Sequence, residues 1–543
     1  MLRVHQIKMN IDHRTEEIEA QLRKKLGMGS AGPLTWRIAR ESLDLRKGQA
    51  PRVVYSIDLE VGAKEGSILK RLGKDAEKLP EPPHIVAEPQ KAQADNRIKL
   101  AHPPVVIGFG PAGMFAAELL SRQGLTPLII ERGSRVERRA EAIERFWSSG
   151  VLDPECNVQF GEGGAGTFSD GKLTSRSKDP RGQQVLDLFA ALGAPEDIRY
   201  RQKPHIGTDI LRGVVKGMRL RIEAQGGTFM FDTRVDRIER LPGGHFELTL
   251  SNGETIHSEI VILAIGHSAR DTVTMLHEEG VEMTQKPFAV GLRIEHRQED
   301  IDAQQYGEHL DSLKGRYGAA EYKLTAKTTE GRGVYTFCMC PGGEVVAASS
   351  EGGGVVTNGM SRRARALENA NSALLATVTP EDFGGDQLLA GVEFQRTLEK
   401  AAFELGGRTY GAPYMMVDEF LGFRPFDPER HHEGVAPTYR PDPVKADFRA
   451  VMPTFLLKAL QEGLTEMGQK MKAFADGEAI LTAFETRSSS PVRLVRHERS
   501  LESISHPGLF PCGEGAGYAG GITSSAIDGI RVAEEILSRW RNQ

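Results

Sequence analysis

The sequence predicts an α/β protein with three parts: a two-part Rossmann-like domain, an α+β domain inserted into it, and a small N-terminal α+β module of ferredoxin-like type. Three observations predict this fold. Residues 105–131 read as an apolar strand, a glycine turn, a helix, a second strand and an acid. Residues 506–540 read as a short strand, a Gly-Glu pair and a long amphipathic helix. Residues 52–61 alternate apolar and polar side chains, which is typical of a strand with one buried face.

The first 78 residues are predicted to form the small module. RVHQIKMNI reads as a strand, and residues 15–26 read as a helix with Ile18, Leu22 and Leu26 on one stripe. SILKRLG reads as a second, short helix that closes the module. The strand between the two helices has one apolar face, formed by Val53, Tyr55, Ile57, Leu59 and Val61.

Length and charge favour several domains of unequal character. A chain of 543 residues is expected to hold two to four domains. Residues 1–75 carry 15 Lys and Arg against 10 Asp and Glu, whereas the whole chain has a net charge of −5, which is too mild to specify a partner. Residues 79–102 are rich in Pro and charge and are interpreted as a linker.

Cysteine content and hydropathy favour a cytoplasmic protein. The chain has four cysteines and no C-x-x-C pair, so we expect buried thiols without a redox-active disulfide. So few cysteines in a long chain fit a reducing compartment. The N-terminus lacks the apolar core of a signal peptide, and no stretch approaches the roughly 18 apolar residues of a membrane span. No metal site is predicted.

Three stretches match G-x-G-x-x-G, and the first has the full context of a dinucleotide site. In GFGPAG, Gly108 allows the tight turn, Gly110 lets a pyrophosphate approach the backbone, and Gly113 lets helix and strand pack closely. Pro111 suits the first helical turn, whose free N–H groups face the phosphates. Glu131, at the end of the second strand, is placed to accept the ribose hydroxyls. The predicted cofactor contacts also include the neighbours Ala112 and Arg132.

The third match, GAGYAG at 515–520, has no second strand or acid after it and cannot be a complete Rossmann unit. Its strand, Gly-Glu pair and helix are typical of the closing element of a two-part flavin domain. Gly513 would let the ribityl phosphate pass, and Glu514 would accept a ribityl hydroxyl. The helix N-terminus, at Gly521, Ile522 and Thr523, would stabilise negative charge on the reduced ring.

The second match, GEGGAG at 161–166, is followed by polar residues rather than an apolar helix. We interpret it as backbone that lines the flavin or the substrate, and a plain glycine-rich surface loop is the alternative. Two positions between the motifs complete the set: Val235 is placed to clamp adenine with its backbone, and Gly266 turns the chain back under the cofactor. The contacts expected from the second match are Gly163, Gly164, Gly166 and Thr167.

The sequence resembles the bacterial FAD-dependent dehydrogenases of the NAD(FAD)-utilising type, whose physiological substrate is not generally known, and more broadly FAD proteins of the glutathione-reductase-type fold. The resemblance covers nearly the whole chain. It implies FAD, an N-terminal accessory domain and a substrate domain inserted between two halves of the FAD-binding domain. The expected boundaries are 1–78, 79–102, 103–285, 286–490 and 491–543. The resemblance rests on GFGPAG, NVQFGEGGAGTFSDGKL, KPHIGTDIL, AIGHSARDT, YTFCMCPGGEVV, TNGMSRR, ETRSSSPVR, CGEGAGYAGGITSSAIDG and ESLDLRKGQAPRVVYSIDLEV.

The leading hypothesis for function is an FAD-dependent oxidoreductase that passes a hydride to or from an anionic or carbonyl-bearing small molecule. His205 is a candidate for proton transfer, and Arg424 and Arg487 are candidates for gripping a planar anion. Ordinary structural roles are the alternative for all three: a core histidine and two ion-paired arginines. Further candidates in the same segments are Asp170, Lys172 and Arg493.

Two other functions stay open. The first is an RNA-directed flavoprotein, although nucleic acid is the less favoured partner; the second is a non-catalytic flavin-binding interaction protein. Because no second complete nucleotide unit exists, NAD(P)H is expected to bind transiently if it is used, and no membrane partner is expected. The basic residues that would hold RNA phosphates are Arg37, Arg40, Arg46, Lys47 and Arg52, near the aromatic residues Trp36 and Tyr55.

Overall fold

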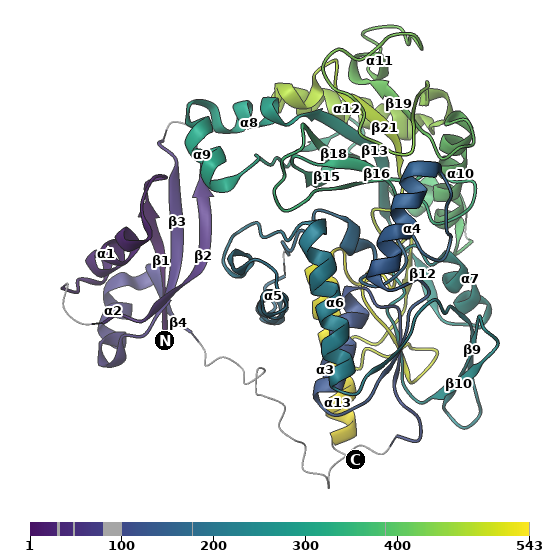
Figure 1. Cartoon of the computed structure of the whole chain (residues 1–543), viewed down its shortest axis with the longest axis horizontal. Helices are drawn as coiled ribbons and strands as arrows, with labels where there is room; N and C mark the ends of the chain where they lie inside the picture. The colour runs from purple at the N-terminus through teal and green to yellow at the C-terminus, as the bar shows by residue number, and fades with distance from the viewer. Residues whose placement is uncertain (30–32, 47–48, 80–99, 176, 386, 542–543) are drawn as a thin grey trace.

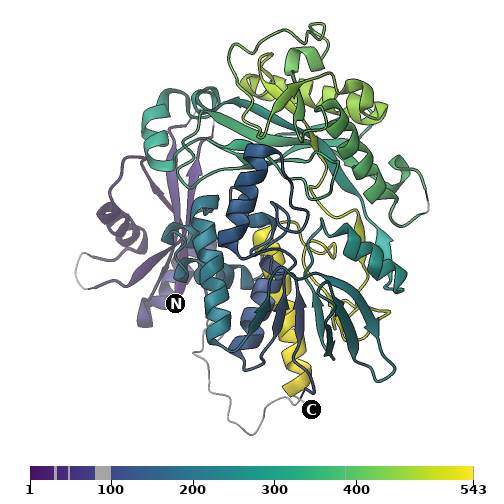
Figure 2. The same cartoon turned by 45° about the vertical axis from the view of Figure 1, so that its right-hand side comes forward.

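The computed structural model describes residues 1–29, 33–46, 49–79, 100–175, 177–385 and 387–541. Most of the predicted linker, residues 80–99, and Lys47 of the predicted basic patch lie outside the described residues. The described chain has the mixed α/β character that the sequence predicts. Figures 1 and 2 show the N-terminal module beside the body of the molecule, and the inserted domain above the Rossmann-like domain.

The N-terminal module has the element order β-α-β-β-α-β, which is that of ferredoxin-like units. Its four strands pair antiparallel in the order β2-β3-β1-β4. Ile18, Leu22 and Leu26 are buried against the sheet, as predicted, and Tyr55 is 1% exposed. The elements are β1 (Leu2–Met9), α1 (Thr15–Leu26), β2 (Trp36–Asp44), β3 (Arg52–Leu59), α2 (Glu65–Leu72) and β4 (Ala76–Lys78).

Sequence reasoning missed β2 and β4, and both lie at the edges of this sheet. An edge strand lacks a neighbour on one side, so its burial does not alternate cleanly. Strand β2 is mostly half-buried along its length, with a register shift between Ile38 and Arg40. Strand β4 is only three residues long. Neither segment therefore shows the period-2 pattern that identified β3.

The Rossmann-like domain is a parallel five-stranded sheet in the order β23-β11-β5-β6-β7. Numbered along the chain, this is 3-2-1-4-5, the order of the first five strands of a doubly wound sheet. The sheet contains β5 (Val105–Ile107), β6 (Leu128–Ile130), β7 (Thr228–Met230), β11 (Val261–Leu263) and β23 (Leu509–Pro511). The other elements are α3 (Pro111–Arg122), α4 (Val136–Ser149), α5 (Arg181–Ala191), α6 (Thr208–Ala224), β8 (Val235–Arg240), β9 (Phe246–Leu250), β10 (Thr255–Ser258), α7 (Arg270–Glu278) and α13 (Ile522–Arg541).

Alternate residues of this sheet pack into different layers, as the period of a strand requires. Val106 and Ile262 pack into the core formed with α3, α5, α6 and α13. Val105 and Leu263 face the opposite layer, formed by α7 and by the antiparallel strands β8, β9 and β10. Because both faces are covered, the short strands consist almost entirely of apolar residues.

The inserted domain is a seven-stranded sheet in the order β14-β15-β18-β13-β21-β19-β20, mostly antiparallel. One face packs on α10 and α12 to form the largest apolar core. The opposite face lies over the Rossmann-like domain (Figure 1). The sheet strands are β13 (Phe288–Arg297), β14 (Thr325–Lys327), β15 (Gly333–Cys340), β18 (Asn369–Val378), β19 (Ala412–Met416), β20 (Pro443–Lys445) and β21 (Ile480–Glu485). The other elements are β12 (Met283–Gln285), α8 (Gln298–Tyr306), α9 (Leu310–Tyr317), β16 (Glu344–Ala347), β17 (Thr357–Met360), α10 (Ala390–Leu405), α11 (Val417–Phe420), α12 (Thr454–Lys470) and β22 (Val492–Leu494).

The chain enters and leaves the inserted domain at one place. Strand β12 comes just before the first strand of the insert, β22 follows its last strand, and the two pair antiparallel. This pairing joins the entry and the exit, so the insert is held by a double connection.

Among the described helices, none combines the length and the apolar character needed to cross a membrane.

The module meets the body mainly through α9. Arg316 donates hydrogen bonds to the carbonyl oxygen of Ile11 (2.9 Å) and to the hydroxyl of Tyr55 (2.9 Å). Elsewhere, the backbone N–H of Glu41 donates to the carbonyl oxygen of Tyr200 at 2.7 Å. The module has its own apolar core, into which Tyr317 reaches, and its Ile11 and Leu43 pack against the core of the body.

We expect a chain that begins at Pro103 to fold without the module, because nearly all buried apolar residues of the module pack in a core of their own. The truncated chain should be soluble and should show cooperative thermal unfolding followed by circular dichroism, in one transition or in one per domain. The full chain with Arg316→Ala is the matched control, since it keeps the module and loses its main hydrogen bonds. An insoluble truncated chain beside a soluble control would show that the module belongs to the core.

Candidate functional site

A cavity of about 1270 Å³ lies between the Rossmann-like domain and the inserted sheet. It is larger than the roughly 300–1,000 Å³ of most small-molecule pockets. Its lower wall comes from the turn at 107–112, the loop at 164–166 and the segment 512–525. Its upper wall comes from β15 and from residues 485–488, both in the inserted domain. The three glycine motifs and the insert therefore meet at one site.

The first glycine motif forms the floor by close contact of backbone with backbone. Gly108 has φ +93°, and a Cβ there would lie 2.4 Å from the carbonyl oxygen of Ala264. A Cβ on Gly113 would lie 2.0 Å from the carbonyl oxygen of Gly108. Helix α3 starts after Gly110 with no side-chain cap, so the N–H groups of its first turn face the cavity. A helix N-terminus of this kind binds phosphate groups.

Glu131 lines the cavity and also connects, through hydrogen bonds, backbone segments around its lower wall. Its carboxylate accepts hydrogen bonds from the backbone N–H groups of Phe109 (2.8 Å), Gly133 (3.0 Å) and Gly161 (2.9 Å). A carboxylate has about four acceptor sites, so little of it is left for a ribose. The backbone takes three of these sites, so one acceptor site of Glu131 remains for the predicted contact with the ribose hydroxyls. Arg132 lies on the same wall and is held by Asp271 and Glu155.

The loop of the second glycine motif leans against the first. A Cβ on Gly164 would lie 2.9 Å from the Cα of Gly110, so the two loops touch through backbone atoms. Gly164 and Gly166 line the cavity, whereas Gly163 and Thr167 lie behind it, against Val215 and each other. The loop thus faces the cavity with two of the four residues expected to contact the cofactor.

Arg139 organises this loop and was missed by sequence reasoning. It is fully buried in α4, and burial lowers its pKa to about 10. The signal was its position, because it shares the buried stripe of α4 with Val136, Ile143 and Phe146. An arginine on such a stripe needs acceptors inside the protein. Its guanidinium donates to the carbonyl oxygens of Asn157, Val158, Gly161, Glu162 and Gly164.

The third glycine motif brings α13 to the cavity. Gly521 and Ile522 line it, whereas the Thr523 hydroxyl turns away and donates to the carbonyl oxygen of Leu173 at 2.8 Å. Gly513 packs on α3, where its Cβ would lie 2.7 Å from that of Ala112. The positive end of this helix therefore faces the same space as that of α3.

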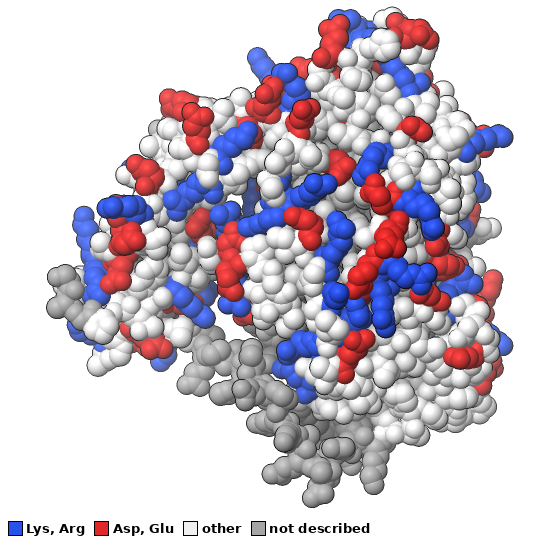
Figure 3. Space-filling view, viewed as in Figure 1, with Lys and Arg blue, Asp and Glu red and all other residues white. Residues whose placement is uncertain are grey.

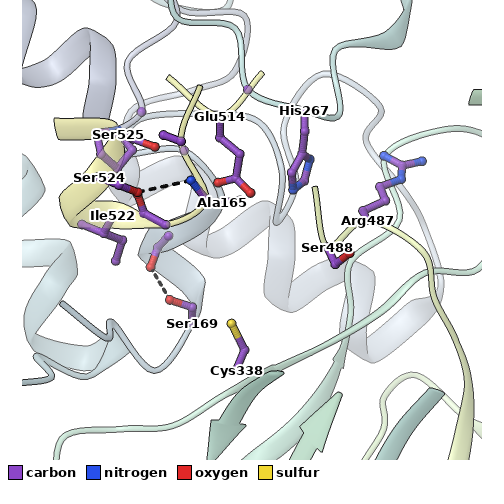
Figure 4. Close-up of a pocket in the computed structure, with 18 of the residues that line it drawn as sticks. Ala165, Ser169, His267, Cys338, Arg487, Ser488, Glu514, Ile522, Ser524 and Ser525 are labelled. Atoms are coloured by element: carbon purple, nitrogen blue, oxygen red, sulfur yellow. Dashed lines mark hydrogen bonds between the residues drawn. The ribbon is translucent and has the colours of Figure 1, made fainter. Parts of the chain in front are cut away.

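Two titratable side chains lie next to each other on this wall, as Figure 4 shows. Burial raises the pKa of Glu514 to about 7, opposed by the charge of Lys286. Burial and the nearby charges of Arg487 and Arg270 lower the pKa of His267 to about 3. His267 was not among the predicted residues, although it stands directly after Gly266, a predicted cofactor contact that also lines the cavity. Val235, the predicted adenine contact, also lines it.

The structure brings only one of the three predicted catalytic residues to the cavity. Arg487 lines it, and Arg424 does not: its side chain is 64% exposed and pairs with Asp418 at 3.1 Å. His205 lies outside the lining residues, with Nε2 3.3 Å from the carbonyl oxygen of Arg363. Burial and the charge of Arg365 lower the pKa of His205 to about 4, so it is neutral near pH 7.

Arg487 is fully engaged in a buried ion cluster. Glu399 receives Arg487 at 3.0 Å and Arg270 at 2.7 Å, and Thr486 also donates to it at 2.7 Å. Glu399 is 2% exposed. Burial alone would raise the pKa of Glu399, but the charges of Arg487 and Arg270 hold it well below its usual range. Arg270 belongs to α7 and Glu399 to α10, so the cluster joins the two domains.

The sequence predicted four buried thiols, and this prediction is wrong for one of them. Cys156, Cys340 and Cys512 are buried, but Cys338 is exposed and lines the cavity. A β-bulge in β15 is the reason: the register shifts between Phe337 and Cys340, and Cys338 adopts φ +43°. Figure 4 shows its side chain reaching into the cavity from the strand.

Comparison with known proteins agrees with this geometry. Residues 287–488 match the family described as FAD-dependent protein, C-terminal domain-like. An uncharacterized protein of Clostridium beijerinckii is 45% identical over 543 residues, which cover 99% of each chain. Residues 287–488 therefore belong to that domain family, and the chain as a whole belongs to one family with the Clostridium beijerinckii protein. The family match spans nearly the whole insert, from the start of β13 to just after β21.

Solved structures give only slight likenesses. The halogenase PltM, in complex with phloroglucinol and FAD, aligns with a TM-score of 0.37 and 10% identity over 81% of this chain and 70% of its own. NikD, an unusual amino acid oxidase, aligns with a TM-score of 0.36 and 12% identity over 81% of this chain and 94% of its own. Likenesses of this size say nothing about what this chain binds.

FAD is the cofactor of this flavoprotein, and the residues at the cavity fit it. The floor at Gly110 and Gly164 has no side chains, so a pyrophosphate has room against the backbone. The uncapped first turn of α3 supplies hydrogen-bond donors for its charge. Residues of α13 and Glu514 line the same cavity, where they can face the ribityl chain and the ring.

We expect Gly110→Val to abolish FAD binding. The new Cβ would clear the protein, since its nearest atom is the Cα of Gly164 at 3.7 Å, but the branched side chain would fill the space of the pyrophosphate. Gly213→Val is the matched control, because a Cβ there meets no atom within 4 Å on the exposed face of α6. The measurement is chromatography of cofactor released by heat, and normal FAD content in Gly110→Val would contradict the assignment.

We expect Glu399→Gln to destabilise the protein by about 3–5 kcal/mol, because two buried arginines would lose their shared carboxylate. Glu393→Gln, on the same helix, is the control: its side chain is 62% exposed, and its pair with Arg396 should contribute less than about 1 kcal/mol. Urea unfolding measures both. Equal midpoints for the two variants would show that the cluster does not join the domains.

Proposed function

We propose that this flavoprotein is an oxidoreductase of the dehydrogenase type, which moves a hydride between FAD and a small molecule held beneath the inserted sheet. The observation that carries the proposal is the continuity of the cavity from the glycine floor to β15. The cavity includes the space that FAD itself would fill, and it extends from there to strand β15 of the insert. A substrate placed there would lie between the flavin site and the sheet.

The chain's own residues supply position, charge and exclusion of water, and FAD supplies the redox chemistry when bound. The first turn of α3 would hold the pyrophosphate. The N-terminus of α13 would stabilise negative charge on the ring. Glu514, with a pKa of about 7, can hold or release a proton at its carboxyl oxygen near neutral pH.

We still propose an anionic or carbonyl-bearing substrate, but residues other than the three expected ones would bind it. Arg487 is neutralised by Glu399, and Arg424 and His205 lie outside the cavity lining. None of the three is free to receive a substrate anion. The charge that could do so lies elsewhere on the cavity wall.

If NAD(P)H is the electron donor, we propose that it binds transiently, because the described chain has a single strand–glycine–helix unit followed by a second strand and an acid. The donor would then use the same cavity before the substrate. The glutathione-reductase-type fold is part of the same proposal, supported by the parallel sheet and the antiparallel strands β8 to β10.

The RNA-directed alternative finds little support in the module. Tyr55 is 1% exposed, and the indole N–H of Trp36 donates to Glu19 at 3.2 Å, so these rings are poorly placed for stacking on bases. Arg37 and Arg46 pair with Asp58 and Asp44. Figure 3 shows basic and acidic side chains intermixed over the visible face of the module.

The test is redox turnover of the purified holoprotein under anaerobic conditions. We expect NADH or NADPH to bleach the visible absorbance of the flavin, and a quinone or a carbonyl compound to restore it with saturable kinetics. Gly110→Val protein, which lacks the cofactor, is the blank. A flavin that dithionite reduces but that exchanges electrons with no nicotinamide, quinone or carbonyl compound would favour a non-catalytic flavin-binding protein instead.

A further inference from the structure

A chain of ion pairs lies along one side of the cavity. Arg365 pairs with Asp170 at 2.6 Å and with Glu321 at 2.7 Å. Lys172 pairs with Asp170, and Lys203 pairs with Glu321 at 3.4 Å. Except for Arg365, these residues line the cavity. Three cations therefore face two carboxylates, so the group carries one positive charge in excess.

Lys323 adds a further positive charge, which has no counter-charge. It lines the cavity, is exposed, and stands two residues after Glu321. It has no hydrogen-bond or ion-pair partner among the residues that the structure describes. Its segment leads into β14, whose Thr325 pairs with Tyr335 of β15. The unpaired lysine thus lies beside the strand that forms the upper wall.

The upper wall next to these lysines is apolar and aromatic. Tyr335 and Phe337 stand on the same face of β15, and they pack with Ala373 and Leu375 of β18. Val334, just before this pair, and Met339, two residues after it, belong to the core on the other face of the sheet. No described helix contributes to this small cluster, and both aromatic residues line the cavity. A flat ring could therefore lie against this face.

We propose that the substrate is a planar apolar molecule that carries one anionic group, a carboxylate or a phosphate. The ring lies against Tyr335 and Phe337, and the anion is received by Lys323, with Lys172 and Lys203 beside it. The inference rests on the proposed function only in calling this molecule a substrate. The binding site itself is inferred from these residues alone. Lys323 is the decisive residue, because the other two lysines already serve carboxylates.

The experiment is a titration of the FAD-loaded protein with 2-naphthoate and with 2-naphthyl phosphate, followed by the change in the visible spectrum of the flavin. Neutral 2-naphthamide and acetate are the comparison ligands. We expect both anionic naphthalenes to bind more tightly than 2-naphthamide, and acetate to bind weakly. The stronger of the two anions identifies the anionic group.

Lys323→Gln should weaken the binding of the anionic naphthalenes about three- to ten-fold and leave 2-naphthamide unchanged, because only a charge is removed. Lys327→Gln is the matched control: Lys327 is exposed, lies four residues further along, and is not among the residues that line the cavity. Phe337→Leu should weaken all three naphthalenes alike, since it removes aromatic contact and no charge.

The outcomes separate this inference from the proposed function. If Lys323→Gln and Lys327→Gln bind 2-naphthoate and 2-naphthyl phosphate equally well, the inference is wrong, whether or not the flavin turns over. If binding depends on Lys323 but the flavin exchanges electrons with no partner, the site is right and the oxidoreductase proposal fails. Tighter binding of 2-naphthamide than of both anions also overturns the inference.

Discussion

The position of the inserted sheet over the FAD site depends on one buried carboxylate. Glu399 of α10 is shared by Arg270 of α7 and by Arg487, which follows β21. Each of these charges loses its water on burial, and the loss is offset where the three meet, with Glu351 as a second partner of both arginines. The cluster therefore favours a single relative placement of the two domains. A shift of the insert would leave charges buried without partners.

The polar groups around the cofactor site mostly serve the backbone. Glu131 receives N–H groups from three separate segments, and Arg139 donates to the carbonyl groups of the second glycine loop. Where two loops must approach within contact distance, as at Gly110 and Gly164, side chains cannot fill the space between them. Buried charges then take the hydrogen bonds that a helix or a sheet would otherwise supply. The result is a floor without side chains, which a pyrophosphate can approach.

Charge on the cavity wall is arranged differently on its two sides. Near the domain joint, the arginines are neutralised by Glu399 and Glu351. Along the side formed by 170–172, Lys203 and 321–323, three lysines face two carboxylates. Arginine suits rigid paired contacts between protein groups, whereas lysine remains a movable point charge. This difference explains why the arginines expected to bind substrate have structural roles.

Local patterns were enough to predict several elements and contacts. The strand–glycine–helix unit at 105–122, the buried stripe of α1 and the buried face of β3 depend on neighbours along the chain, and each was identified. The closing helix α13 also follows from its own sequence. Edge strands such as β2 were missed, because their burial depends on a neighbour that they have on one side only.

The sequence by itself determined the glycine turns, the helical stripes and the alternation of strands, because these depend on the backbone freedom and period of a few consecutive residues. Only the tertiary structure decided which polar residues face the cavity. Arg487 and Glu399 are 88 positions apart, and Arg365 and Asp170 are 195 apart, so no local pattern could show that they meet. The exposure of Cys338 depends on a bulge set by pairing with β18. A long-range ion pair neutralises a charged side chain, whereas a charged side chain without such a partner remains available to a ligand.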